Sequence, residues 1–159
     1  MTSAAMPESE IPSAAEHPIV LYDGVCGLCN RSVRFVLNRD PKGFFQFASL
    51  QSAVAGRILA RHGANRTDLD TMYVALNCTP ADGEGRNREI LLSRSDAALF
   101  VLKELGGAWR VIAGAIRFLP RAVRDWGYRL IASNRYRTFG RYDECPIPSE
   151  ATRARFLDV

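Results

Sequence analysis

The architecture of this chain can be worked out from one stretch, Tyr22-Asp23-Gly24-Val25-Cys26-Gly27-Leu28-Cys29-Asn30. An apolar run, Ile19-Val20-Leu21, precedes it and predicts a strand, and the residues from Arg31 to Arg39 have helical spacing. Two cysteines separated by two residues therefore stand where a strand passes into a helix. The unpaired N–H groups and partial positive charge of a helix N-terminus stabilise a thiolate, which can lower a cysteine pKa from about 8.5 to roughly 3.5–7.5.

Helical spacing separates the two sulfur atoms. One face of the predicted helix carries Cys29, Val33, Val36 and Leu37, so we expect Cys29 to face the sheet. Cys26 lies before the first turn and off that face, so we expect it to face solvent. Residues three apart at a helix start have Cα atoms about 5–6 Å apart, within the range of an unstrained disulfide. The pattern predicts an exposed attacking thiol, Cys26, beside a sheltered resolving thiol, Cys29, as exchange through a mixed disulfide requires.

Three interpretations of the cysteine pair are open at this point: a redox pair, part of a metal site, or an inert pair. The position between strand and helix favours the redox pair. A structural zinc site needs four ligands, and the chain has one CxxC. The other ligands would have to come from single positions, namely Cys78, Cys145, His17 or His62. A lone cysteine in a loop is most often just a small apolar residue.

The acidic residue of the stretch, Asp23, has two interpretations. In the first, its carboxylate takes or relays the proton of a thiol, which requires a carboxyl pKa raised by burial. In the second, its side chain caps the following helix. A full negative charge close to Cys26 would also raise the pKa of that thiol, against the effect of the helix N-terminus.

The stretch resembles the signature of the DCC family, thiol-disulfide oxidoreductase-like proteins named after one aspartate and two cysteines, here Asp23, Cys26 and Cys29. The resemblance continues at Phe47-Ala48-Ser49-Leu50-Gln51, Ser93-Arg94-Ser95-Asp96-Ala97 and Ala132-Ser133-Asn134-Arg135-Tyr136, and spans about residues 18 to 142. It implies a thioredoxin-like fold and dithiol–disulfide exchange on a protein or small-thiol substrate. Cys26 would attack, Cys29 would resolve the mixed disulfide, and Asp23 would tune or relay protons. No cofactor and no metal are expected for this activity.

The apolar patterns along the chain fit that fold. Further strands are predicted at residues 44–48, 71–76 and 89–93, and helices at 52–62 and 95–105, with a loop at 78–87. In this order the first two strands pair in parallel across a helical crossover, and the last two form an antiparallel hairpin. We therefore expect an α/β, thioredoxin-like fold with a four-stranded mixed sheet flanked by helices, and a C-terminal helical extension.

One position departs from the thioredoxin pattern. Enzymes with that fold usually carry a cis-proline just before the third strand, facing the active disulfide, whereas this chain has Asp70-Thr71-Met72. In those enzymes the loop presents backbone groups to the substrate and keeps metals away from the thiols. The departure keeps a second hypothesis open, in which the fold is a non-catalytic binding module or holds a metal at its CxxC.

With 159 residues the chain has the length of one domain, within which we expect three segments. Residues 1–17 contain three glutamates but no lysine or arginine, and are predicted to be a disordered lead-in. Residues 18–107 form the thioredoxin-like core, and residues 108–159 a basic helical extension packed on it. A reducing cytoplasm is the expected location, because neither a secretory signal nor an apolar span of membrane length is found.

The positive charge of the chain is concentrated in the extension. Between Gly107 and Arg141 there are eight arginines and one acidic residue, on helices predicted at 108–119 and 120–133. This charge is either the solvated outer face of helices that cover the sheet, or a surface for a peripheral membrane or acidic protein partner through residues 108–141. Nucleic acid is disfavoured because no binding motif accompanies the charge. The aromatic residues here, Trp109, Trp126, Tyr128 and Tyr136, are predicted to pack in the core.

Overall fold

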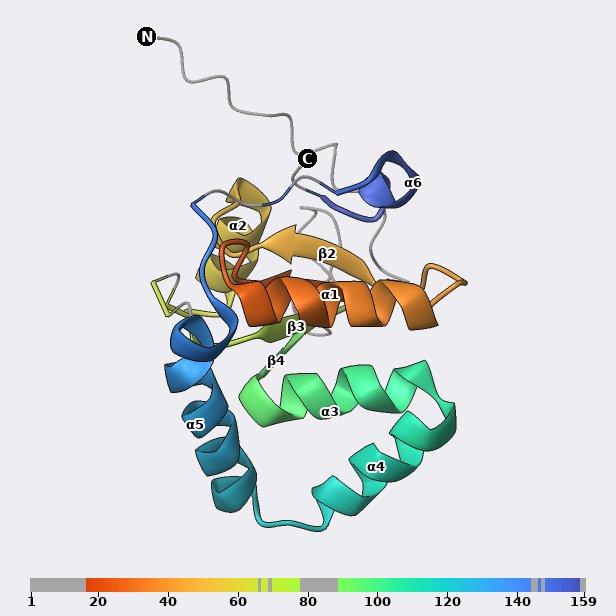
Figure 1. Cartoon of the computed structure of the whole chain (residues 1–159), viewed down its shortest axis with the longest axis vertical. Coiled ribbons are helices and arrows are strands. Elements are labelled where there is room, and N and C mark those ends of the chain that lie inside the picture. The colour runs from red at the N-terminus through yellow and green to blue at the C-terminus, as the bar shows by residue number, and fades with distance from the viewer. Residues whose placement is uncertain are drawn as a thin grey trace, which may run out of the picture.

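Figure 1 shows the computed structural model of the chain, which describes residues 17–65, 67–68, 70–77, 89–143, 146 and 148–157. The strands in these ranges are β1 (Ile19–Tyr22), β2 (Gln46–Ser49), β3 (Tyr73–Leu76) and β4 (Ile90–Ser93). The helices are α1 (Gly27–Arg39), α2 (Ala53–Arg61), α3 (Arg94–Leu105), α4 (Gly107–Arg117), α5 (Arg121–Phe139) and the short α6 (Glu150–Arg153). Up to α3, their order along the chain is the one predicted from the sequence.

The four strands form a mixed sheet in the order β2-β1-β3-β4. Strand β1 is parallel to β2, with Ile19 opposite Gln46, and antiparallel to β3, with Ile19 opposite Ala75. Strands β3 and β4 are antiparallel neighbours. Helix α1 connects the parallel strands, which a tight turn cannot join. The predicted α/β, thioredoxin-like architecture with a four-stranded mixed sheet is therefore confirmed.

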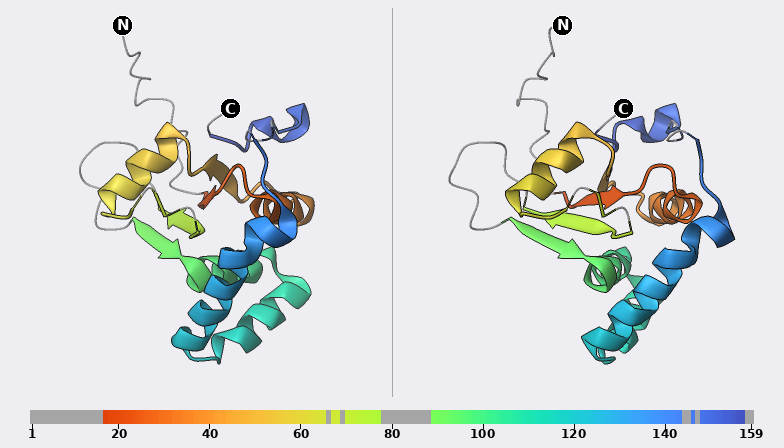
Figure 2. Two further views of the ribbon diagram at one scale, coloured as in Figure 1. Left: turned by 60° about the vertical axis from the view of Figure 1, so that its left-hand side comes forward. Right: turned by 90° about the vertical axis from the view of Figure 1, so that its left-hand side faces the viewer.

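The central strand β1 is buried along its length, because helices cover both faces of the sheet (Figure 2). Ile19 and Leu21 pack with apolar side chains of α2, whereas Val20 and Tyr22 pack with those of α1 and α3. Fully burying an apolar side chain of this size contributes roughly 1.5–3 kcal/mol to stability. Because side chains alternate along a strand, β1 contributes to both halves of the core. The core thereby fixes the end of β1, where the CxxC stretch begins.

Helix α5 is longer than the sequence indicated. It was predicted to end at residue 133, but it continues to Phe139, and Gly140, with a φ of 80°, follows it. Ser133 and Asn134 are poor residues for a helix interior, yet their side chains donate hydrogen bonds to the carbonyl oxygen of Leu130, at 3.1 and 2.8 Å. The helix therefore reaches the N-terminal end of α1 (Figure 1).

Backbone hydrogen bonds attach the end of α5 to the junction between β1 and α1. The N–H of Gly27 donates to the carbonyl oxygen of Gly140 at 3.1 Å, and the N–H of Tyr142 donates to that of Val25 at 2.7 Å. A side chain at position 27 would prevent this contact, because a Cβ atom there would collide with the carbonyl oxygen of Phe139. Two segments that are far apart in the sequence thus form one structural unit.

Several of the sequence-based predictions concern residues outside the described ranges. They are the lead-in up to residue 16, the loop at 78–87 with Cys78, and Cys145. Helices α4 and α5, from the segment predicted as an extension, contact α3, and α5 also contacts α1. Among the described residues, no helix is both long enough and apolar enough to cross a membrane.

Candidate active site

The two cysteines lie at the start of α1, and their exposures differ from the prediction. Cys26 is the N-cap residue and is 0% exposed, whereas Cys29, in the first turn, is partly exposed. The prediction of a solvent-facing Cys26 and a sheltered Cys29 is therefore wrong. The reason is the segment that follows α5, because the backbone of Arg141 pairs with that of Cys26. Helical spacing carries no information about a distant segment that packs over the junction.

The pKa values of the two thiols nevertheless differ in the predicted direction. A hydrogen bond from the Cys29 side chain, and one from the Cys29 backbone N–H to Cys26 Sγ at 3.2 Å, lower the pKa of Cys26 to about 6 against the effect of burial. The charge of Arg135 adds to the lowering, and the charge of Asp23 opposes it. The pKa of Cys29 is raised, because its thiol donates to Cys26 and is itself desolvated. At neutral pH the pair therefore carries a thiolate on Cys26 and a thiol on Cys29.

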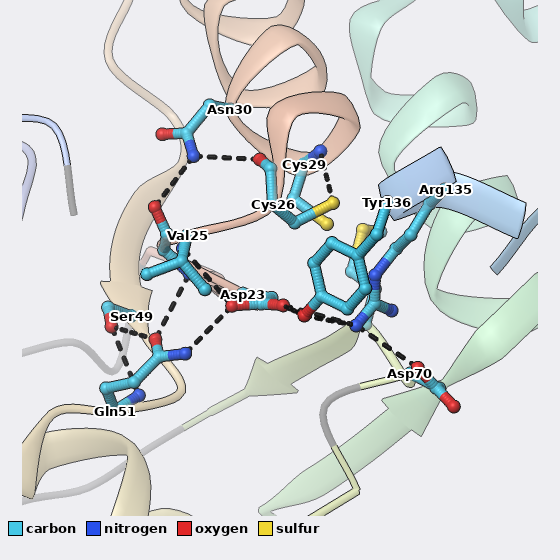
Figure 3. Close-up of polar contacts among 12 residues, drawn as sticks. Asp23, Val25, Cys26, Cys29, Asn30, Ser49, Gln51, Asp70, Arg135 and Tyr136 are labelled. Carbon is cyan, nitrogen blue, oxygen red and sulfur yellow. Dashed lines mark hydrogen bonds and ion pairs between the residues drawn. The ribbon is translucent and has the colours of Figure 1, made fainter. Parts of the chain in front are cut away.

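Asp23 is buried, and its carboxylate accepts hydrogen bonds from donors in three parts of the chain (Figure 3). The Gln51 amide donates at 2.8 Å, and the backbone N–H of Val25 donates at 3.2 Å. From α5, the Arg135 guanidinium forms an ion pair at 3.2 Å, and the Tyr136 hydroxyl donates a further hydrogen bond. With four donors the carboxylate is held in one orientation.

The interpretation of Asp23 as the cap of α1 is wrong. The cap is Cys26, whose sulfur accepts the N–H of Cys29, while Asp23 accepts the N–H of Val25 two residues further on. Within the described part of the chain, no hydrogen bond joins the Asp23 carboxylate to either sulfur. The proton relay through Asp23 stays a prediction.

Two residues of α5 that were not assigned to the site from the sequence complete it. Arg135 is 3% exposed, and its Nη2 contacts Asp23, the Tyr136 hydroxyl at 2.9 Å and the Asp70 carboxylate at 3.1 Å. Tyr136 was predicted to be a packing residue. Burial and the hydrogen bond to Asp23 raise the pKa of its hydroxyl. The sequence did contain one indication that both residues belong to the site. They lie in the run from 132 to 136, one of the segments that resemble the DCC family.

Side-chain amides fix the loop between β1 and α1. Asn30 donates to the carbonyl oxygens of Gly24 and Cys26, at 2.8 and 2.9 Å. The Gln51 side-chain oxygen accepts the N–H of Gly24 at 3.1 Å and the hydroxyl of Ser49 at 2.6 Å. The loop that carries Cys26 is therefore held from α1 on one side and from the end of β2 on the other.

The residues considered as zinc ligands do not form a cluster with the CxxC where they can be placed. No group of three or more His, Cys, Asp or Glu side chains suited to a metal ion occurs in the described ranges. His17 Nδ1 lies 3.1 Å from the carbonyl oxygen of Phe44, and His62 Nε2 lies 3.1 Å from the Glu89 carboxylate. Both histidines therefore have partners outside the cysteine pair.

The backbone before β3, where thioredoxin-fold enzymes present groups to a substrate, is already occupied. The N–H of Met72 donates to the Tyr128 hydroxyl at 2.7 Å, and the Met72 carbonyl oxygen accepts the N–H of Arg94 at 3.0 Å. Burial raises the pKa of Tyr128 to about 12, so this hydroxyl stays neutral. The described residues contain no cis peptide bond. A substrate could therefore not pair with the backbone of Met72 unless these hydrogen bonds opened.

Comparison with known proteins agrees with this site. The family of DCC1-like thiol-disulfide oxidoreductases matches residues 20–141. The uncharacterised protein YuxK of Bacillus subtilis is 37% identical over 152 residues, which are 96% of this chain and 99% of that protein. A chloroplastic DCC family protein of Arabidopsis thaliana is 33% identical over 132 residues, 83% of this chain and 70% of that protein. No solved structure matches the chain. The chain belongs to the DCC1-like thiol-disulfide oxidoreductase family.

Proposed function

We propose that the protein is an enzyme that carries out dithiol–disulfide exchange through Cys26 and Cys29. The observation that carries the proposal is the pair of sulfurs at the start of α1, a buried one with a pKa of about 6 and a partly exposed one. Exchange needs a thiolate that leaves readily and a sulfur that the substrate can reach. Membership of the family supports the same chemistry.

In this proposal the two sulfurs have different tasks from those predicted, because their exposures differ from the prediction. In the reducing direction the Cys26 thiolate takes the proton of the Cys29 thiol, and Cys29 Sγ, the sulfur that is partly exposed, attacks the substrate disulfide. The S–S bond of the substrate breaks, one half leaves as a thiolate that takes up the proton from Cys26, and the other half forms a mixed disulfide with Cys29. The Cys26 thiolate then attacks Cys29 Sγ, the bond between Cys29 and the substrate sulfur breaks, and the substrate leaves as a thiolate. This step closes the Cys26–Cys29 disulfide and completes reduction of the substrate. In the reverse direction the substrate thiolate opens that disulfide, and Cys26 is the leaving group.

Asp23 has a positioning role in this proposal. Its carboxylate holds the Arg135 guanidinium at 3.2 Å, and the charge of Arg135 favours the thiolate form of Cys26. Gln51 and Tyr136 keep the carboxylate in place from the opposite ends of the site. The exchange needs no cofactor. It does need a compartment in which the pair is not permanently oxidised. The cytoplasmic location stays a prediction, since one relative is chloroplastic.

Reversible oxidation of the pair is the expected result when the protein is equilibrated with mixtures of reduced and oxidised glutathione. Mass spectrometry of alkylated peptides should find a disulfide between Cys26 and Cys29 that disappears as the reduced fraction rises. In the reduced protein, the ultraviolet absorbance of the thiolate should rise with pH with a midpoint near 6, because Cys26 loses its proton there.

The Cys29→Ala variant is the matched control for that titration. It removes the thiol that donates to Cys26, so the midpoint should move up toward the usual cysteine value of about 8.5. A pair that stays reduced in every glutathione mixture would contradict the proposal. So would protein that retains one equivalent of zinc through its cysteines when purified without chelator.

A second candidate function, binding to an anionic membrane surface, is favoured by α4 and α5. These helices and the turn between them expose the apolar side chains of Val111 (72%), Phe118 (92%), Trp126 (66%) and Leu130 (52%). The prediction that Trp126 packs in the core is therefore wrong. The same helices carry exposed arginines that form no ion pair with any described residue, namely Arg110, Arg117, Arg129 and Arg137. Exposed apolar and basic side chains together are typical of helices that lie on anionic lipid.

Sedimentation with lipid vesicles tests this second candidate. The protein should bind vesicles that contain phosphatidylglycerol and not vesicles of phosphatidylcholine alone. Phe118→Ser with Trp126→Ser should weaken binding about tenfold or more, because two large exposed apolar groups are lost. Ile90→Ser, which changes an exposed apolar residue (50%) on β4, away from these helices, is the control and should bind normally. Equal binding by all variants, or a protein dimer that the double variant abolishes, would contradict membrane binding.

A further inference from the structure

An apolar cavity of about 550 Å³ lies beside Cys29, between α1, α3 and α5. Its walls include the side chains of Leu28, Val33, Val36, Phe47, Val101 and Ile131. The space is partly open to solvent, so a molecule from solution can enter it. Sites for small molecules have volumes of roughly 300–1,000 Å³ and mainly apolar walls. The cavity therefore has the dimensions and the lining of a small-molecule site.

The few polar groups of the lining connect the cavity to the cysteine pair. Cys29 lines the cavity, whereas the fully buried Cys26 does not. Arg135 also lines it and is 3% exposed, and its Nε has no hydrogen-bond partner among the described residues. That Nε atom is closed off from solvent, so the accessible lining next to Cys29 is almost wholly apolar. The Tyr128 hydroxyl, also in the lining, already accepts the N–H of Met72.

A peptide fits the lining of this cavity less well than a small molecule does. Each peptide residue brings a backbone donor and acceptor that must be paired when buried. The cavity offers few partners, and helices α1, α3 and α5 form much of its wall, so no strand edge is available there for a peptide to extend. The backbone of Met72, the other common docking point in this fold, is occupied by Tyr128 and Arg94.

We propose that this cavity binds the substrate of the Cys26–Cys29 pair, and that the substrate is a small apolar thiol or its disulfide, whose sulfur reacts at Cys29. The inference rests on the proposed function and adds the class of substrate to it. The apolar body of the molecule occupies the space between the three helices. Its sulfur lies at Cys29, which lines the cavity.

The exchange step balances without a further reagent. A first substrate thiol loses its proton to water, and the resulting thiolate attacks Cys29 Sγ of the oxidised protein. The S–S bond between the two cysteines breaks, and Cys26 leaves as a thiolate. A second substrate thiolate then attacks the substrate sulfur of the mixed disulfide, and Cys29 leaves and takes up a proton. Two substrate thiols are oxidised to a disulfide, and the protein disulfide is reduced.

A series of straight-chain alkanethiols, from ethanethiol to hexanethiol, is the probe for this proposal. These thiols have similar sulfur chemistry and differ in apolar length. Each should reduce the oxidised protein at a rate measured by thiol counting or by tryptophan fluorescence. We expect the second-order rate constant to rise about two- to fourfold per added methylene group, because each group is buried in the cavity. Equal rate constants along the series would overturn the proposal.

A variant that fills the cavity provides the structural control. Ala98 lines the cavity from α3 and is only partly buried, so Ala98→Phe places a ring in that space. The ratio of the hexanethiol rate constant to the ethanethiol rate constant should fall toward one in this variant. The matched control is Ala115→Phe, on the exposed side of α4 and outside the cavity, and it should keep the ratio of the parent protein. A ratio that Ala98→Phe leaves unchanged would contradict the assignment.

Two measurements separate failure of this inference from failure of the proposed function. If the glutathione titration finds a reversible disulfide but the alkanethiol rates do not vary, the substrate class is wrong and exchange stands. In the Cys26→Ser/Cys29→Ser variant, which cannot react, hexyl methyl sulfide should still displace an apolar fluorescent dye from the cavity. If the dye is displaced from this variant but the parent protein shows no exchange activity, the proposed function is contradicted. The cavity would then be a binding site without a reaction. A dithiol peptide that reacts faster than hexanethiol would overturn the inference.

Discussion

Replacement of either cysteine of the pair is expected to abolish turnover, by about a thousandfold or more, since each variant loses a reacting group. The two variants should differ in what they accumulate. With oxidised glutathione, Cys26→Ser should form a stable mixed disulfide at Cys29, because no second thiol is present to release it. Cys29→Ser should form much less, because the remaining Cys26 is 0% exposed. Mass spectrometry of the intact protein measures both.

The background for this comparison is a protein with Cys78→Ser and Cys145→Ser, so that only the pair can react. If Cys29→Ser accumulates the mixed disulfide and Cys26→Ser does not, then Cys26 is the sulfur that meets the substrate. That result would restore the order of attack predicted from the sequence. It would also show that the segment after α5 moves away from Cys26 during the reaction.

The Arg135→Leu variant is expected to lose about 3–5 kcal/mol of the free energy of unfolding. Arg135 is the buried cation paired with Asp23, and both side chains are almost fully enclosed, with 3% and 0% exposed. Its removal would leave the Asp23 carboxylate buried without an opposite charge. Urea unfolding measures the loss, and an unchanged dependence on urea concentration would show that the unfolded state is not altered.

The second partner of Arg135 provides the control. The Asp70 side chain is 68% exposed, so its ion pair with Arg135 is screened by water, and Asp70→Asn should cost about 1 kcal/mol or less. The double variant Asp23→Asn/Arg135→Leu removes both buried charges and should recover part of the lost stability. An Arg135→Leu variant no less stable than Asp70→Asn would contradict the structural role assigned to the buried ion pair.

The elements of the fold that could be predicted are those with a pattern in neighbouring residues of the sequence. The apolar run before the CxxC and the helical spacing after it are each visible in a few neighbouring residues. The parallel pairing of β1 with β2 and the antiparallel pairing of β3 with β4 follow from the element order, because a helical crossover and a hairpin leave few topologies. The two cysteines and Asp23 were identified in the same way, from one stretch at the junction.

The rest of the site depends on contacts between distant segments. Cys26 was assigned the wrong exposure because the backbone of Arg141 covers it, and nothing near position 26 indicates this. Arg135 was counted as one of eight arginines in a basic segment, although it is buried against Asp23. Its role depends on α5 continuing past residue 133, which the polar residues Ser133 and Asn134 concealed. The spacing of apolar residues does not show which charged residue of a helix is buried.

Because α5 is attached to the junction between β1 and α1, the two cysteines differ in exposure only after α5 has been synthesised. During synthesis the CxxC leaves the ribosome long before Arg135 and Arg141 have been added to the chain. Throughout that interval Cys26 has no cover, and Asp23 has no buried cation beside it. A small oxidant that meets the growing polypeptide can therefore react at either sulfur. Only when the last long helix docks is Cys26 buried while Cys29 stays partly exposed, so the difference in exposure between the two sulfurs is a property of the finished chain.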